Sequence, residues 1–214
     1  MGQFILTEGL YLYPTPAGAY YAVISNAVEQ PRQFIRQLLL NNRTFALNPD
    51  NLKLTMQQDD MQACFELLQH CQNLGWLQGL EETLDYPAGA LGEILPSLLE
   101  GISDSDKVLL ADSEGFNLCS YGFSDAEAEI LSALSAELAN KDARLAGMLG
   151  KHLGLASHAW SMVDAFGNSQ IGFWPLYIGN NRFVLVISGT PHFNQPDFVS
   201  LVWALSVRYG NYSV

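Results

Sequence analysis

The segment that most constrains the fold is a long amphipathic helix predicted between Ser124 and Gly154, with short apolar strands before and after it. Ser124 is followed three residues later by Glu127, and this spacing is typical of a capping box at a helix start. Gly154 tolerates the left-handed backbone that often ends a helix. A helix of this length needs a broad apolar surface to cover, so we expect it to lie across a β-sheet.

Five segments around this helix have the aromatic and β-branched content of strands, two before it and three after it. They are residues 107–112, 117–122, 157–164, 170–179 and 182–189. A helix over 91–102 contains Pro96, which would kink or shorten it. A closing helix begins near Pro196. This order predicts an α+β fold in which a five-stranded antiparallel sheet is covered by helices.

The long helix, residues 125–153, carries two stripes of side chains at helical spacing. The larger stripe, predicted to lie on the sheet, is Ile130, Leu134, Leu138, Leu145 and Leu149. The second stripe is made of small residues: Ser132, Ala136, Ala139, Ala143, Gly147 and Gly150. Helix propensity explains the alanines, but each interior glycine costs about 1 kcal/mol. The small stripe therefore predicts close contact with a second helix, most simply in a homodimer.

The first 85 residues form a separate predicted subdomain, joined through the Pro- and Gly-containing connector 81–90 to a second domain at 90–214. The pattern favours strands at 4–13, 19–25, 51–56 and 76–80, a helix opening at Pro31, and a helix from Asp59–Asp60 to Gly75. Helices followed by a short hairpin resemble a winged-helix arrangement. A DNA-reading helix would be basic, whereas 59–75 contains neither Lys nor Arg.

Charge and hydropathy limit the classes of partner. The net charge is −12, and neither half of the chain is basic, so we expect no nucleic-acid binding. No apolar run approaches the roughly 20 residues of a membrane-spanning helix, and the first residues do not resemble a signal peptide. These patterns predict a soluble, cytoplasmic protein with no membrane insertion.

No arrangement of catalytic or metal-binding residues is visible. His70, His152, His158 and His192 share no metal-ligand spacing with Cys64, Cys71 and Cys119. Cys64 and Cys71 lie about two helical turns apart, roughly 10.5 Å, which exceeds the reach of a disulfide. The chain also lacks the Gly-rich phosphate loop of a GTPase. We therefore predict a protein that is not an enzyme and that needs no cofactor or metal.

Residues 107–209 resemble the roadblock (dynein light-chain) family. The resemblance is carried by VLLADSEGFNLCSYG, by the Ala- and Leu-rich helix AEAEILSALSAEL, and by the hairpin GFWPLYIGNNRFVLVIS. It covers about half of the chain and does not extend to the N-terminal part. It implies a profilin-like α/β/α sandwich.

The family also implies a partner class. Roadblock proteins commonly form homodimers by pairing their central helices and joining their sheets through the third strand. In this chain the third strand includes His158, Trp160 and Met162. Bacterial members of the MglB type bind Ras-like small GTPases. The resemblance therefore predicts a non-catalytic, bacterial regulator or scaffold that binds such a GTPase.

Two alternatives from other classes stay open. The winged-helix-like part could make the chain a transcription regulator. Profilin-like sheets also build ligand pockets, so a small-molecule sensor lined by Trp160, Phe173 and Trp174 is a third reading. Aromatic side chains of this kind are found more often in a hydrophobic core.

Overall fold

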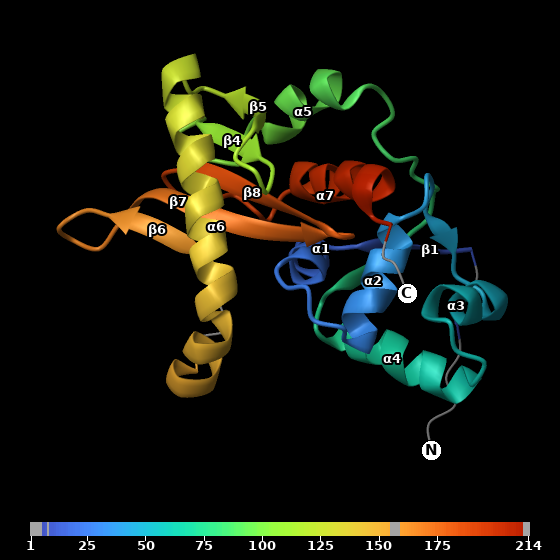
Figure 1. Cartoon of the computed structure of the whole chain (residues 1–214). Helices are drawn as coiled ribbons and strands as arrows, with labels where there is room; N and C mark the ends of the chain where they lie inside the picture. The colour runs from blue at the N-terminus through green and yellow to red at the C-terminus, as the bar shows by residue number, and fades with distance from the viewer. Residues whose placement is uncertain (1–5, 8, 155–158, 212–214) are drawn as a thin grey trace.

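The computed structural model describes residues 6–7, 9–154 and 159–211 of the 214-residue chain (Figure 1). The helices are α1 (Pro16–Val23), α2 (Gln30–Leu39), α3 (Pro49–Met56), α4 (Met61–Asn73), α5 (Leu91–Leu99), α6 (Asp125–Leu153) and α7 (Pro196–Tyr209). The strands are β1 (Tyr11–Pro14), β2 (Phe45–Ala46), β3 (Leu77–Leu80), β4 (Val108–Ala111), β5 (Asn117–Tyr121), β6 (Trp160–Val163), β7 (Ser169–Ile178) and β8 (Asn181–Ser188).

The C-terminal part is built on a five-stranded sheet with the order β5-β4-β8-β7-β6. Every neighbouring pair is antiparallel, as the sequence predicted. The long first strand of the last hairpin, β7, pairs with both β6 and β8, while β5 and β6 form the two edges. This arrangement leaves β6, the predicted dimer strand, without a neighbour on its outer side in the described chain.

Helices cover both faces of this sheet, which gives the predicted α/β/α sandwich (Figure 1). Successive strand residues point to opposite faces. On one face Leu109, Val184 and Val186 form a core with α6. On the other face Leu110, Leu185 and Ile187 join the core that contains α5 and α7. The fully buried strand β4 therefore supplies side chains to both cores.

The face that α6 turns to the sheet differs from the prediction. Ile130, expected against the sheet, is 67% exposed, whereas Leu131, Ser135 and Ala139 are buried. Leu134 and Leu138 lie at the margin of this core, half-buried. The sheet already contributes large side chains such as Phe173. Mostly small helix residues fill the remaining space. The prediction that the largest apolar side chains of α6 face the sheet was therefore wrong for Ile130.

The start of α6 is the predicted capping box. The Ser124 hydroxyl accepts a hydrogen bond from the Glu127 backbone N–H at 3.4 Å, and Glu127 Oε2 accepts from the Ser124 N–H at 2.7 Å. Lys107 Nζ lies 3.2 Å from Glu127 Oε1. The backbone and hydroxyl of Ser124, aided by Lys107, lower the pKa of Glu127 to about 2.

This cap gives a pH-dependent prediction. Ser124→Ala should lower the free energy of unfolding by about 1 kcal/mol at pH 7. The carboxylate of Glu127 stabilises the folded chain fully above its ordinary pKa, and this contribution is lost as the pH falls toward about 2. The difference between wild type and Glu127→Gln in urea denaturation should therefore shrink between pH 5 and pH 3. Ser113→Ala, at an exposed turn, should leave stability unchanged; an equal loss there would contradict the cap.

The N-terminal part differs from the predicted winged helix. Its three-stranded sheet has the order β2-β1-β3, and four helices stand between these strands in sequence. Residues 19–25 and 51–56, predicted as strands, fall largely in α1 and α3. Thr15 caps α1 by accepting from the Gly18 N–H, and Asn48 caps α3 by accepting from the Asn51 N–H. The winged-helix arrangement is thus not confirmed.

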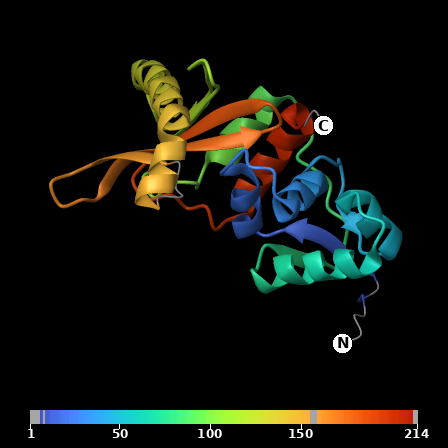
Figure 2. The same cartoon turned by 60° about the horizontal axis from the view of Figure 1, so that its bottom comes forward.

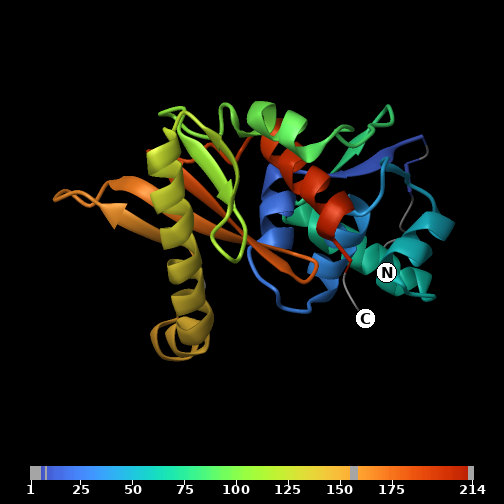
Figure 3. The ribbon, with the colours of Figure 1, turned by 45° about the horizontal axis from the view of Figure 1, so that its top comes forward.

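The N-terminal helices pack directly against the C-terminal part, which begins at α5. Figure 3 shows α7 with the five-stranded sheet on one side and the N-terminal helices on the other. Trp203 of α7 lies 5.6 Å from the ring of Tyr13 in β1, and its indole N–H donates to the Asn41 carbonyl at 2.7 Å. Phe34, Ile35 and Phe198 belong to the same buried cluster. The two predicted domains therefore share one hydrophobic core.

Candidate interaction surfaces

Only part of the predicted small-residue stripe on α6 faces outward. Ser132 and Ala139 are buried against the chain's own sheet, and Ala136 is half-buried. A Cβ placed on Gly115 would lie 3.3 Å from the Ala136 Cβ, so the β4–β5 turn covers this position. Ala143 and Gly150 are exposed, with Gly147 between them on the same helix. The interface predicted from the stripe stays a prediction, and its residues that are exposed in the described chain are Ala143 and Gly150.

A different face of α6 is exposed along its length. Ile130 is 67% and Met148 56% exposed. They are eighteen residues apart, which is five full turns, so both lie on one line of the helix. Glu137, Lys141 and Arg144, all exposed, lie close to that line. We call these five residues the outer line of α6.

The outer line is complementary to itself. An antiparallel copy of α6, related by a two-fold axis that crosses the outer line at the level of residue 139, would place Ile130 against Met148, and Glu137 against Lys141. Apolar side chains would then meet at both ends and opposite charges in the middle. Within the described chain, the main packing partners of α6 are the strands β4, β5, β7 and β8.

The predicted edge strand adds a second exposed element. Trp160 is half-buried, and its indole N–H donates to Asp142 Oδ1 of α6 at 3.3 Å. Met162 and Val163 are exposed. His158 lies outside the described residues. Figure 2 shows the β6–β7 hairpin projecting beyond α6, and Phe166 in its turn is 91% exposed.

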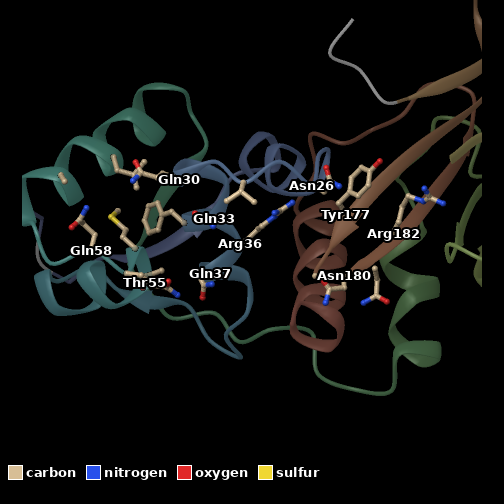
Figure 4. Close-up of a pocket in the computed structure, with 18 of the residues that line it drawn as sticks. Asn26, Gln30, Gln33, Arg36, Gln37, Thr55, Gln58, Tyr177, Asn180 and Arg182 are labelled. Atoms are coloured by element: carbon tan, nitrogen blue, oxygen red, sulfur yellow. The ribbon is translucent and has the colours of Figure 1, made fainter. Parts of the chain in front are cut away.

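A groove of about 780 Å³ lies where the N-terminal helices meet the β7–β8 turn. Figure 4 shows Gln33, Arg36 and Gln37 of α2 on one side, and Tyr177 and Arg182 of the strands on the other. Carboxamides make up a large part of its lining: Asn26, Gln30, Gln33, Gln37, Gln57, Gln58, Asn180 and Asn181. No Asp or Glu of the described chain lines the groove, although the chain carries 22 of them.

The arginines of the groove are held by the chain itself. Arg36 is buried, and its Nε donates to the Ala22 carbonyl at 2.8 Å. Arg182 donates to the Ala139 carbonyl at 3.1 Å and to Asn140 Oδ1 at 2.8 Å. The groove is therefore positively charged, and its two arginine side chains are held in place by hydrogen bonds, within a chain of net charge −12.

The aromatic residues that could line the pocket of a small-molecule sensor, Trp160, Phe173 and Trp174, do not line this groove. Phe173 is buried in the core beneath α6, and Trp174 packs edge-on against Phe193 at 5.4 Å. Tyr177 is the aromatic residue of the strands that borders the groove. Sequence reasoning missed the groove, although Gln30, Gln33 and Gln37 repeat at helical spacing on one face of α2.

The described residues hold no group of three or more His, Cys, Asp or Glu side chains that could bind a metal ion. Across the same part of the chain, no helix combines the length and apolar character needed to span a membrane. All three cysteines are free thiols. Burial raises the pKa of Cys71 to about 11, and it also raises the pKa of Cys64 and Cys119.

The cysteines give a simple labelling prediction. In native protein at pH 8, only the half-buried Cys119 should react with a thiol reagent within minutes, because Cys64 and Cys71 are buried. Unfolding in urea should release all three. Cys119→Ser should abolish the fast reaction. More than one rapidly reacting thiol in the native protein would contradict the burial of the Cys64 and Cys71 side chains.

Comparison with known proteins gives partial structural matches. A roadblock/LC7 domain from Streptomyces avermitilis has a TM-score of 0.36 at 12% identity, over 56% of this chain and 93% of that one. An MglB structure with a tetrameric arrangement has a TM-score of 0.38 at 19% identity, over 60% and 96%. The gliding protein MglB from Thermus thermophilus has a TM-score of 0.36 at 20% identity, over 60% and 96%. No protein-family model and no curated protein matches the chain.

Proposed function

We propose that this chain is a non-catalytic regulator or scaffold that binds a Ras-like small GTPase as a homodimer. The homodimer part of the proposal is carried by the self-complementary outer line of α6 and by the edge of β6, which has no neighbouring strand in the described chain. The resemblance to roadblock proteins implies dimerisation through the central helix and the third strand of the sheet, which are α6 and the edge strand β6 in this chain. Pairing them would cover the exposed Ile130, Met148 and Met162.

The GTPase part of the proposal comes from the family resemblance of residues 107–209. Its test is direct binding. The purified chain is titrated by calorimetry against Ras-like GTPases of the same genome, each loaded with GDP or with a non-hydrolysable GTP analogue. We expect micromolar or tighter binding that depends on the nucleotide. Absence of binding in both states, with the dimer intact, would reject the GTPase partner and leave the dimer standing.

The transcription-regulator reading has less support. Helix α4, which would be its DNA-reading helix, contains Glu66 and no Lys or Arg. The fold of residues 11–80 also differs from a winged helix. A gel-shift series at low salt separates the two readings, because phosphate binding would weaken steeply as salt is added. We expect no shift at any salt concentration.

A further inference from the structure

We propose that the carboxamide-lined groove binds an extended polypeptide segment that lacks basic residues. The groove lies apart from the outer line of α6, and of the predicted dimer stripe only Ala143 borders it. Its volume of about 780 Å³ is within the range of well-formed ligand sites. The N-terminal helices and the β7–β8 turn form it together, so the groove requires both halves of this chain.

The carboxamides match the chemistry of a peptide backbone. Each carboxamide offers both a donor and an acceptor, as a peptide group does, and carries no charge. Gln30, Gln33 and Gln37 follow one another along the exposed face of α2 over about 10.5 Å, the length of roughly three extended residues. Within the described part of the chain these three side-chain amides have no hydrogen-bond partner. They are therefore available to a ligand lying along α2.

The apolar base of the groove and its positive charge limit which peptide sequences could bind there. Phe34, Met56 and Leu67 contribute apolar surface between the polar walls. In an extended peptide every second side chain points the same way, so an apolar residue at alternate positions could rest there. Arg36 and Arg182 are the charged residues of the lining. A basic peptide would find no opposite charge in the groove, whereas an acidic peptide would, and a neutral peptide would meet no repulsion.

Gln57 caps the end of α3 and also lines this wall of the groove. Gln57 follows the last turn of α3 with φ 51°, in the left-handed region where glycine is favoured. A glutamine there is strained, and its side chain lines the groove. Strained residues of this kind cluster at binding sites. Glycine would adopt this backbone conformation with less strain but would remove the carboxamide from the wall.

One substitution at Gln57 separates its effect on stability from its effect on binding. Gln57→Gly should raise the melting temperature by about 2–4 °C, because the left-handed strain is relieved. The same change should weaken peptide binding, because one carboxamide of the wall is lost. A residue with only a structural role would not move stability and binding in opposite directions.

The probe is obtained by panning a phage library of random twelve-residue peptides on the full chain, with Gln33→Ala/Gln37→Ala as the counter-selection protein. Enriched peptides are synthesised with a fluorescein label, and their Kd is measured by anisotropy. We expect peptides without Lys or Arg, a Kd at least tenfold weaker for Gln33→Ala/Gln37→Ala, and a weaker Kd for Gln57→Gly. Gln69→Ala/Gln72→Ala, on the exposed side of α4, is the matched control and should bind as wild type.

The proposal is overturned if no peptide is enriched, if the enriched peptides are basic, or if they bind the Gln33→Ala/Gln37→Ala variant as tightly as wild type. It is also overturned if Gln57→Gly lowers the melting temperature. Because the variants lie away from the outer line of α6, the dimer mass should be unchanged in all of them. The result is therefore independent of the proposed homodimer and GTPase.

Discussion

Replacing Trp203 by alanine should lower the free energy of unfolding by about 3–5 kcal/mol, the largest effect we expect from a single change in this chain. Trp203 is 2% exposed. Its removal would leave a cavity between α7 and β1, where Tyr13 lies, and would leave the Asn41 carbonyl without its indole donor. Both losses fall where the two halves of the chain meet.

The same variant tests whether the halves unfold together. With one shared core, wild type and Trp203→Ala should each unfold in urea in a single transition, coincident by circular dichroism and by tyrosine and tryptophan fluorescence. Trp203→Phe keeps most of the ring and should cost less than alanine. Phe166→Ala removes an aromatic side chain that is 91% exposed and should change stability by less than about 0.5 kcal/mol. Two separated transitions, with residues 1–85 lost first, would show that the shared core does not couple the halves.

Local signals explain which elements the sequence predicted. The start of α6 was predicted because Ser124 and Glu127 form the capping box by themselves. The starts of α1 and α3 were missed although Thr15-Pro16 and Asn48-Pro49 each place a capping residue before a proline, a known helix start. The aromatic and β-branched content of residues 19–25 and the alternation of residues 51–56 favour strands, but the caps at Thr15 and Asn48 begin helices in both places.

The missed features depend on contacts between distant parts of the chain. The rotation of α6 follows from the size of sheet residues such as Phe173 and Val186, which no pattern within residues 125–153 contains. The groove likewise joins residues 26–37 to residues 177–182, and its composition becomes visible only when those segments are brought together. Periodicity along one helix can identify a candidate face, but the neighbouring elements decide which face stays exposed.

The second large effect concerns the proposed dimer. Met148→Arg should raise the dissociation constant of the homodimer at least about 100-fold, because Met148 would occur twice in the interface and would meet Ile130 of the second copy. Met148 is 56% exposed in the described chain, so its replacement should not disturb the fold. Light scattering after size exclusion should show a mass near 23.6 kDa for the variant and twice that for wild type. Leu54→Arg, at an apolar side chain 70% exposed on α3, is the matched control and should stay dimeric.

A charge exchange tests the register of that interface. Glu137→Lys and Lys141→Glu should each weaken self-association, because each sets like charges against one another at two symmetric positions. The two single variants mixed together should pair as a heterodimer, and the double variant Glu137→Lys/Lys141→Glu should recover the homodimer. Such rescue requires Glu137 of one copy to face Lys141 of the other, as a two-fold axis crossing the outer line at the level of residue 139 demands. A homodimer that is indifferent to all three changes would have its α6 helices paired in another register or would not pair them.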